Sequence, residues 1–468
     1  MNALFFGSFL AAMATGIPIA IAMALGSLVY IWISGTIPPL TVVHRMVGGV
    51  DSFPLLAVPF FIFAGNLMNS AGITNRIYDF ALALVGWMRG GLGQVNVVGS
   101  VVFAGMSGTA VADAGGLGTI EIKAMKDHGY PVEFAVGITA ASSTLGPIIP
   151  PSLPMVIYGV QANASIGKLF AAGFVPGIVM ALFMMFMVAW YARVRKYGAD
   201  IAFSWPRMGG AFVELIAVAL VAVVLFKLWG DQELSGLIKF GLPLAGVLIA
   251  DRLLRFRAFM ALLTPVILIG GMASGLFTPT VAAVAAVAWA LFLGFVWYRT
   301  LTWRMLVKIS MDTIETTATV LFIVAAASIF AWVLTTTQVT EAIALWVLSI
   351  SSEPWVFLVL ANLFLLFVGC FMETIAAITI LVPVFMPIVT KLGIDPIHFG
   401  LVMVLNLMIG LLTPPVGMVL FVLAKVSKLS FERTVVAIAP WMLPLFATLA
   451  LITFVPEVVL WLPRLLYP

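Results

Sequence analysis

Apolar runs alternate along the whole chain with short segments that are polar or rich in glycine and proline. The runs lie at about 3–34, 53–70, 92–112, 133–162, 170–192, 210–250, 258–298, 314–350, 354–390, 397–425 and 434–463. A helix needs about 20 apolar residues to cross the hydrocarbon core of a bilayer. The longer runs must therefore hold two short segments or one interrupted helix. This pattern predicts an all-α polytopic membrane protein.

One interruption, "ASSTLGPIIPPS" at 141–152, lies inside the apolar run 133–162. Its prolines Pro147, Pro150 and Pro151 each lack a backbone N–H and restrict the residue before them. We therefore expect a broken helix at about 133–162. A break within a membrane is tolerated only where the freed backbone groups meet protein, water or a ligand.

An internal repeat appears when the chain is compared with itself at an offset of 264 residues. Six positions coincide: Gly105 with Gly369, Gly129 with Gly393, Gly146 with Gly410, Pro150 with Pro414, Pro151 with Pro415 and Pro176 with Pro440. Glycine and proline are frequent in membrane helices and align at times by accident, but chance predicts only about one such coincidence here. We interpret the pattern as a duplicated unit. Two facing units with interrupted helices are the plan of many secondary transporters built from inverted repeats.

At the first break the helix is interrupted, and oxygen atoms become available as possible ligands. Ser142, Ser143 and Thr144 supply hydroxyls, and unwinding frees backbone carbonyls from Thr144 to Ile149. Hard oxygen ligands without a full charge suit a sodium ion. The segment is therefore a candidate Na⁺ site.

The second unit repeats this chemistry with other residue types. Its counterpart, "NLMIGLLTPPVG" at 406–417, lies in a predicted broken helix at about 397–425. Oxygen donors recur at Asn406 and Thr413, and the helix breakers are Pro414 and Pro415. A second Na⁺ site is expected there.

A further polar interruption precedes each broken helix. "GMSGTAVADAGG" at 105–116 contains Ser107, Thr109 and Asp113, and "GCFMETIAAI" at 369–378 contains Glu373 and Thr374. At the same offset Thr109 falls on Glu373. Small residues of this kind predict the tips of two re-entrant hairpins, at about 92–125 and 356–390, which would complete the ion sites from the other side.

Asp113 and Glu373 stand in apolar runs, where a carboxylate is costly and usually faces a cavity. Either residue could instead reach the membrane surface. Of the two, Glu373 is the stronger candidate for a functional site. No Arg or Lys lies within the four polar interruptions, so a substrate carboxylate would be held by hydroxyls, helix N-termini or sodium itself.

Composition excludes several other classes of protein. The mean hydropathy is +1.19 and only 9% of residues are charged, so no soluble domain fits in the chain. Cys370 is the only cysteine, and the three histidines lack the spacing of metal ligands. No ATP-binding or catalytic motif is present, which makes an enzyme unsupported. The net charge of +4 reflects basic clusters at membrane surfaces and does not indicate nucleic-acid binding.

The basic clusters also suggest an orientation. They gather at 193–207, 252–257, 299–308 and 425–433, which the positive-inside rule places in the cytoplasm. No Lys or Arg precedes Arg45, so we expect a retained first helix with its N-terminus outside.

Four segments resemble one known family. "FAGMSGTAVADAGGLGTIEIKAMKDHGY", "TAASSTLGPIIPPS", "GIDPIHFG" and "LNLMIGLLTPPVGMVLFV" are similar to the large membrane subunit of tripartite ATP-independent periplasmic (TRAP) transporters, in the dicarboxylate-transport subfamily. The likeness covers about 1–205 and 258–468. It implies an elevator-type fold, in which a scaffold holds a mobile transport domain with two hairpins and two broken helices.

The resemblance also implies what the protein does. The family imports organic or sugar acids across the bacterial inner membrane, with Na⁺ as coupling ion and no other cofactor. It works with a small four-helix membrane subunit and a periplasmic substrate-binding protein. Carried onto this chain, one ion site would use Ser107, Thr109, Ser142, Thr144 and Gly146, and the other would use Glu373, Thr374, Asn406, Gly410 and Thr413.

Two departures from the family pattern divide the chain and affect its mechanism. Residues 210–250 look inserted, so the chain splits into an N-terminal part at 1–205, an extra hydrophobic hairpin with a basic stretch at 206–257, and a C-terminal part at 258–468. The insertion holds two apolar segments around Lys227 to Glu233. The segment "GLFTPTVAAV" has Val281 where the family usually shows Glu.

Four alternatives stay open at the level of sequence. A related ion-coupled organic anion transporter would need no binding protein. An intramembrane enzyme would use Asp113 and Glu373 as paired acids. A passive channel needs no pair of hairpins, and a structural membrane protein gives no reason for two breaks at equivalent places.

Overall fold

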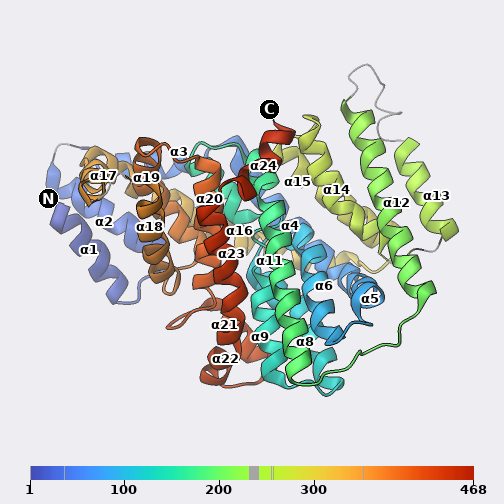
Figure 1. Ribbon diagram of the computed structural model, residues 1–468. Coiled ribbons are helices and arrows are strands. Elements are labelled where there is room, and N and C mark those ends of the chain that lie inside the picture. Colours follow the sequence, from blue (N-terminus) through green and yellow to red (C-terminus); the bar gives the residue numbers. More distant parts are fainter. Residues whose placement is uncertain are drawn as a thin grey trace.

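The structure of the protein is a computed structural model that describes residues 2–35, 37–230, 242–254, 256, 258–350 and 353–467. Within these ranges the regular elements are helices, apart from one isolated bridge between Arg89 and Ala199. Figure 1 shows the helices spread across a broad body, with the N-terminal helices at one edge and α12 and α13 at the other. The all-α fold predicted from the apolar runs is confirmed.

Seven helical segments of the described ranges are long and apolar enough to cross a membrane. They are Phe53–Ser70, Ile166–Val194, Trp205–Trp229, Pro279–Trp297, Trp303–Thr336, Thr374–Lys391 and Phe431–Phe454. Several other apolar helices are only 10–17 residues long, which is short of the roughly 20 residues of a full span. Four short helices lie on either side of the two breaks: Val132–Ser143, Pro396–Gly410 and Met418–Ser427 are apolar helices of this length, and Leu153–Gln161 is shorter still.

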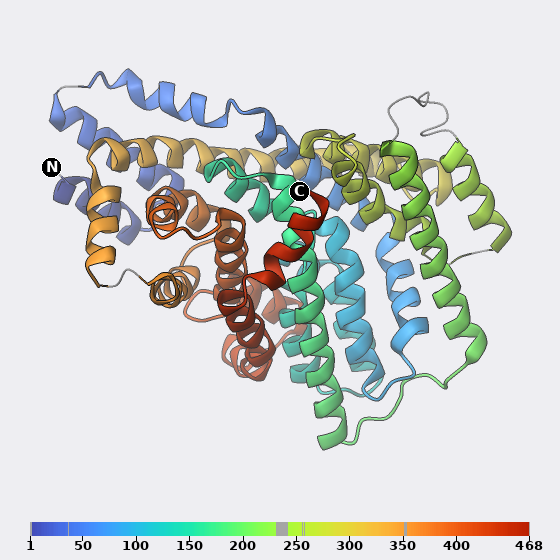
Figure 2. The ribbon, with the colours of Figure 1, turned by 45° about the horizontal axis from the view of Figure 1, so that its top comes forward.

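Four helices form the N-terminal corner of the molecule: α1 (Asn2–Ala14), α2 (Ile19–Ser34), α3 (Leu40–Val50) and α16 (Trp303–Thr336). The C-terminal half of α16 brings the Phe330 ring against Phe5 and Phe9, with ring centroids 4.8 and 5.0 Å apart. Its N-terminal half packs on α4 (Ala57–Ser70), where Asn66 Nδ2 donates to Thr313 Oγ1 at 3.1 Å. Figure 2 shows α16 running along one side of the molecule and so linking these two regions.

A second group of helices packs on α4 or on its neighbour α15 (Pro279–Leu291). Besides α15, it consists of η1 (Phe53–Leu56), α5 (Ile73–Val85), α14 (Phe259–Ala273) and η3 (Phe292–Trp297). α15 packs closely on α4 and on α14. Thr280 Oγ1 donates to the Phe53 carbonyl at 3.2 Å, which joins the start of α15 to the segment before α4.

The extra hydrophobic segment contains two helices, α12 (Trp205–Gly230) and α13 (Leu242–Leu254). The connection between them, which includes Glu233, lies outside the described residues. α12 packs on α14 and α5. Its buried carboxylate Glu214 accepts a hydrogen bond from the Ala258 backbone N–H at 2.6 Å, so α12 is tied to the segment that begins α14.

The two candidate repeat units have matching orders of helices. The first contains α6 (Gly91–Ser107), α7 (Ala110–Gly115), α8 (Leu117–Asp127), α9 (Val132–Ser143), α10 (Leu153–Gln161) and α11 (Ile166–Val194). After α17 (Val339–Ile350), the second contains α18 (Pro354–Gly369), α19 (Thr374–Lys391), α20 (Pro396–Gly410), α21 (Met418–Ser427), α22 (Phe431–Ile438), η4 (Ala439–Trp441) and α23 (Met442–Phe454). The chain closes with α24 (Glu457–Leu466), which packs on α11.

The second half of each broken helix packs on the other unit. α10 contacts α19 and α20, while α21 contacts α7 and α9. Figure 1 shows α9, α21 and α22 together in the lower centre of the view. Tyr158 of α10 is fully buried and donates from Oη to the Pro396 carbonyl at 2.7 Å. A Cβ at Gly400 would lie 2.4 Å from the Tyr158 ring, so glycine there permits this close packing. Because α10 packs on the second unit and α21 on the first, both breaks lie in the region where the two units meet.

Candidate functional site

The first break separates α9, which ends at Ser143, from α10, which begins at Leu153. Pro147, Pro150 and Pro151 all fall between them, and the Pro150–Pro151 peptide bond is cis. Ser152 closes the break as the N-cap of α10, because its Oγ accepts a hydrogen bond from the Met155 N–H at 3.3 Å.

The expectation that unwinding frees every carbonyl from Thr144 to Ile149 is wrong for two of them. The Leu145 carbonyl accepts from the Ile148 and Ile149 N–H groups at 3.0 and 2.8 Å. The Pro147 carbonyl accepts from Ser152 Oγ at 2.5 Å. A tight turn and the N-cap serine satisfy these oxygens locally, because a buried carbonyl without a partner is costly.

The hydroxyls of the first break are buried and point into the protein. Ser142 Oγ donates to Asn96 Oδ1 at 2.7 Å, and Thr144 Oγ1 donates to the Ala141 carbonyl at 2.6 Å. Ser142, Thr144 and Gly146 are all buried. A hydroxyl that donates its proton keeps two lone pairs, so both oxygens retain the capacity to ligate a cation.

The second break separates α20, which ends at Gly410, from α21, which begins at Met418. Pro414 and Pro415 lie between them, again joined by a cis bond. Gly417 precedes α21 with φ of +55°, a left-handed conformation that glycine adopts without strain.

The oxygen donors predicted for the second break differ in their surroundings. Asn406 is fully buried, and its Nδ2 donates to Asn362 Oδ1 at 2.7 Å and to the Asn362 carbonyl at 3.0 Å. Its Oδ1 is buried and has no hydrogen-bond partner in the structure. Thr413 Oγ1 donates to the Ile409 carbonyl at 2.9 Å and keeps its lone pairs.

The two hairpin tips act as N-caps of the helices that follow them. Thr109 Oγ1 accepts from the Ala112 N–H at 3.3 Å at the start of α7. Glu373 Oε2 accepts from the Ile375 and Ala376 N–H groups at 2.9 and 3.1 Å at the start of α19. Thr109 and Glu373, which coincide at the offset of 264, therefore both cap the N-terminus of the helix that follows them.

The neighbours of these caps complete the predicted set. Thr374 is buried beside Glu373, and its Oγ1 has no hydrogen-bond partner in the structure. Ser107 ends α6, and its side chain lies outside the described part of the chain.

Each hairpin tip is hydrogen-bonded to the break of its own unit. The Leu153 N–H donates to the Gly108 carbonyl at 3.3 Å, and the Val416 N–H donates to the Cys370 carbonyl at 3.2 Å. In the second unit Gly410 also packs directly on Gly369, where an added Cβ would lie 2.5 Å from the Gly369 Cα. The structure therefore brings each tip to its break, as required if both contribute to one site.

Sequence reasoning missed two asparagines that hold the breaks. Asn96 of α6 contacts Ser142, and Asn362 of α18 contacts Asn406. Asn362 is held in turn by Thr453, to whose Oγ1 its Nδ2 donates at 3.0 Å. Their position in the sequence could have indicated this role, because an asparagine inside an apolar membrane helix usually forms hydrogen bonds to another helix.

Asp113 and Glu373 have different neighbours. Asp113 is 1% exposed and lies close to Ser100 and Glu121 within the first unit, whereas Glu373 contacts the first turn of α19. Among the described residues, no contact pairs these two acids as an intramembrane enzyme would need.

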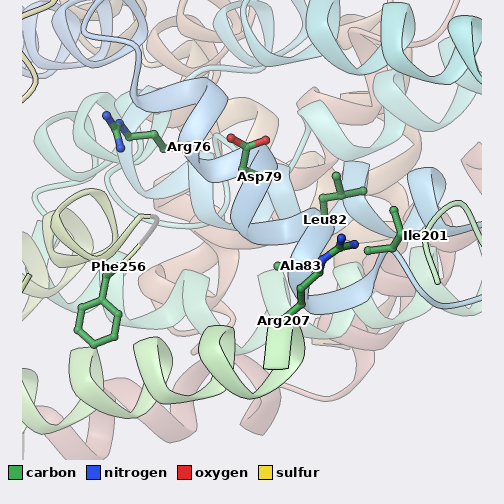
Figure 3. Close-up of a pocket in the computed structure, with 7 residues that line it drawn as sticks. All are labelled: Arg76, Asp79, Leu82, Ala83, Ile201, Arg207 and Phe256. Atoms are coloured by element: carbon green, nitrogen blue, oxygen red, sulfur yellow. The ribbon is translucent and has the colours of Figure 1, made fainter. Parts of the chain in front are cut away.

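A cavity of about 450 Å³ lies outside the two breaks and the two hairpin tips (Figure 3). It is lined by Arg76, Asp79, Leu82, Ala83, Ile201, Arg207 and Phe256. Figure 3 shows Asp79 between the two arginines in that view, with α5 forming one wall. None of its lining residues belongs to a break or a hairpin tip, so the cavity is not part of the candidate ion site.

Comparison with known proteins places the chain in a family. The family profile described as "Tripartite ATP-independent periplasmic transporter, DctM component" matches residues 6–458. The sialic acid TRAP transporter large permease protein SiaM of Vibrio cholerae is 41% identical over 450 residues, which cover 96% of this chain and 95% of SiaM. The C4-dicarboxylate TRAP transporter large permease protein DctM of Pseudomonas aeruginosa is 39% identical over 414 residues, which cover 88% of this chain and 87% of DctM.

Among solved structures, MtrF of Neisseria gonorrhoeae superposes with a TM-score of 0.55 at 14% identity, covering 88% of this chain and 83% of that one. This likeness supports the membrane-transporter fold. The relatives are permeases, so the protein is a transporter and not an enzyme, and it lies in the bacterial inner membrane as a multi-pass protein. The resemblance inferred from the motifs is confirmed: the chain belongs to the DctM component family, the large permeases of tripartite ATP-independent periplasmic transporters.

Proposed function

We propose that this large permease imports an organic or sugar acid by coupling its movement to Na⁺. The observation that carries the proposal is the pair of broken helices, each with buried oxygens and each touched by its own hairpin tip. Na⁺ prefers such oxygen ligands, and interrupted helices in facing repeats hold coupling ions in other secondary transporters.

The first ion site would use Thr109, Ser142, Thr144 and Gly146, with Ser107 at the tip. The second would use Glu373, Thr374, Asn406, Gly410 and Thr413. Two oxygens support the second site directly, since Asn406 Oδ1 and Thr374 Oγ1 are buried without partners. A bound ion would satisfy both.

A carboxylate is the substrate group best supported. Curated relatives carry the names of sialic acid and C4-dicarboxylate transporters, and these substrates share an acid group. The breaks contain no Lys or Arg, so the substrate would rest between the two sites against hydroxyls, the starts of α10 and α21, and the bound sodium.

An elevator movement fits the division of the helices. The two units interlock through α10 and α21, which supports their motion as one transport body. α1 to α5 and α12 to α16 would form the scaffold. α4 packs on both α15 and α16 within this scaffold, and the packing of α5 on α6 and of α16 on α19 would form the surface along which the transport body moves.

The proposed transporter has two further components, a small four-helix membrane subunit and a periplasmic binding protein that captures the substrate. α12 supports the first of these, because it exposes the apolar side chains Ile216, Leu220 and Val223 along one face. Docking of the small subunit to this inserted helix is one role that would explain the insertion.

The test is uptake by proteoliposomes that contain this chain with its small subunit, assayed with and without the binding protein and an inward Na⁺ gradient. The proposal expects uptake that needs both. It also expects Thr144→Ala combined with Thr413→Ala to abolish Na⁺ dependence. Thr335→Ala with Thr336→Ala is the matched control, because these exposed threonines make the same hydroxyl-to-carbonyl bonds within a helix.

Two outcomes would count against parts of the proposal. Intact Na⁺ dependence in the Thr144 and Thr413 double variant would show that the ion sites lie elsewhere. Na⁺-driven uptake without the binding protein would favour a stand-alone organic anion transporter.

A further inference from the structure

Two carboxyl groups are buried together in the first hairpin. Asp113 of α7 and Glu121 of α8 are each 1% exposed. They lie close enough for the charge of Asp113 to act on Glu121. Neither belongs to the ion sites proposed above, and sequence reasoning did not single out Glu121.

One oxygen of Glu121 is held by an amide. Asn96 Nδ2 donates to Glu121 Oε2 at 2.6 Å and to Thr139 Oγ1 at 2.8 Å. The carboxyl group fits because Gly99 stands opposite it, where an added Cβ would lie 3.0 Å from Glu121 Oε1. α6, α8 and α9 thus fix the position of this carboxyl group.

Three oxygens in the same cluster have no hydrogen-bond partner. They are Glu121 Oε1, Asp113 Oδ2 and Ser100 Oγ, all buried. Ser100 is 1% exposed and lies beside Asp113 without a hydrogen bond of good geometry. The oxygens come from three consecutive helices, α6, α7 and α8, which pack on one another.

The cluster has two acidic groups and, among the residues that the structure describes, no fixed cation. The two ion pairs found in the described residues join Lys391 to Glu341 and Arg464 to Glu457, and neither includes Asp113 or Glu121. No Lys, Arg or His acts on either buried carboxyl group. A buried carboxylate is stable only when a cation or hydrogen bonds compensate it, so the cluster lacks a positive partner.

We propose that this cluster binds a sodium ion, through Glu121 Oε1, Asp113 Oδ2 and Ser100 Oγ. The inference rests on the proposed sodium coupling only for the identity of the ion. One carboxylate balances the charge of a sodium ion, and the second carboxyl group would carry a proton. Calcium takes 6–8 oxygen ligands, more than the three unpartnered side-chain oxygens of the cluster. The remaining ligands of the sodium ion would be water or backbone carbonyls.

The site belongs to the first unit alone. At the offset of 264, Asp113 and Glu121 fall on Ala377 and Phe385, which have no ligand oxygen in their side chains. The proposed ion therefore has no symmetry-related counterpart. Through Asn96, which also accepts from Ser142 Oγ at 2.7 Å, the cluster is connected to the first break.

The experiment measures Na⁺ binding, not transport. The full chain is purified with its small membrane subunit, and bound ²²Na⁺ is counted at constant ionic strength kept with K⁺. Glu121→Gln preserves the shape of the side chain and an acceptor for Asn96 while removing the charge. The expected result is one Na⁺ fewer per protein than in the wild type, with a smaller rise of Tm on Na⁺ addition. Glu133→Gln is the control, because Glu133 is exposed on α9.

A second variant keeps the inference testable if Glu121→Gln fails to fold. Ser100→Ala retains both carboxyl groups and removes one neutral ligand, so it should weaken one class of Na⁺ site by about tenfold. The double variant of Thr144 and Thr413 to Ala should keep the Glu121-dependent ion while losing those at the breaks.

Each contrary result has its own meaning. Unchanged Na⁺ binding in both Glu121→Gln and Ser100→Ala would overturn the site, and a changed pH dependence of unfolding in the same variants would show a held proton in its place. Displacement of the Glu121-dependent ion by micromolar Ca²⁺ would overturn the choice of sodium. A wild-type protein that binds no Na⁺ at all would overturn the proposed function as well, which distinguishes the two failures.

Discussion

Asn406 of the second broken helix donates from Nδ2 to Asn362 Oδ1 at 2.7 Å. Ser142 of the first broken helix makes the equivalent contact, donating to Asn96 Oδ1 at 2.7 Å. In both units an asparagine on the first arm of the hairpin thus orients the residue that comes before the break. Ser142 and Asn406 coincide at the offset of 264, whereas their partners Asn96 and Asn362 do not. The two units therefore hold the equivalent residue of each break with an asparagine from a different position of the same hairpin arm, which supports a common function for the two breaks.

Replacing Asn362 should weaken the second ion site. Asn362→Ala removes the Oδ1 acceptor of the buried Asn406 amide and leaves only the backbone carbonyl of residue 362, so Asn406 Oδ1 is held less firmly. Loss of a residue that positions a metal ligand typically costs about 10–100-fold in affinity. We expect the Na⁺ concentration for half-maximal uptake to rise by roughly tenfold or more, as measured in proteoliposomes.

The neighbouring residue provides the control for that substitution. Leu363 is 62% exposed on α18, so Leu363→Ala should leave the Na⁺ dependence as it is. A lower Tm for Asn362→Ala with an unchanged Na⁺ requirement would assign Asn362 a purely structural role.

Gly410→Ala should destabilise the protein although alanine is the better helix former. An added Cβ would lie 2.5 Å from the Gly369 Cα, and overpacking of this kind costs about 1–3 kcal/mol. We expect a lower Tm in thermal unfolding. Gly210→Ala on α12 meets nothing within 4 Å and should leave Tm unchanged or slightly higher. A Gly410→Ala protein as stable as the wild type would refute the close approach of α18 and α20.

Glu373→Gln separates the capping role of Glu373 from a role of its charge. The glutamine oxygen still accepts from the Ile375 and Ala376 N–H groups, so Tm should change little. If the charge ligates Na⁺, the Na⁺ requirement for uptake should rise by tenfold or more. Glu315→Gln, at an exposed site on α16, serves as the control. Equal Na⁺ dependence in Glu373→Gln and wild type would leave Glu373 as a helix cap only.

Val281→Glu should stabilise the protein without changing transport. Thr278 is the N-cap of α15 and accepts from the Val281 N–H at 3.3 Å, so position 281 is the place where a capping box carries Glu or Gln. With valine there, the reciprocal bond to the N-cap N–H is missing. We expect a gain of about 0.5–1 kcal/mol, seen as a higher Tm. Val284→Glu, one turn later and equally exposed at 43%, cannot reach the N-cap and should give no gain.

Much of the local structure could be predicted from the sequence. The prolines at 147, 150, 151, 414 and 415 lie between helices that end at Ser143 and Gly410 and resume at Leu153 and Met418. Proline lacks a backbone N–H and restricts the residue before it. Single prolines such as Pro176 and Pro265 stay inside helices, so it is the clustering of prolines at the two breaks that made them predictable. The equivalence of Thr109 and Glu373 was likewise visible as an offset before either was seen to cap a helix.

The contacts that make a site of these segments could not be predicted in the same way. Glu121 was overlooked because it stands in an ordinary helical stretch, and only the packing of α6, α8 and α9 buries it against Asn96. The carbonyls of Leu145 and Pro147 were expected to be free, but a turn and Ser152 satisfy them. The assignment of the ion ligands and the elevator movement stay predictions.

Membrane class, helix breaks and the duplicated order of glycine and proline follow from the sequence of this protein, because hydropathy and backbone chemistry act residue by residue. The tertiary structure alone decided that α10 packs on the second unit and α21 on the first, and that Asn96 links Ser142 to Glu121. These contacts join residues tens to hundreds of positions apart. Their geometry depends on how complete helices pack, and no local pattern encodes that packing.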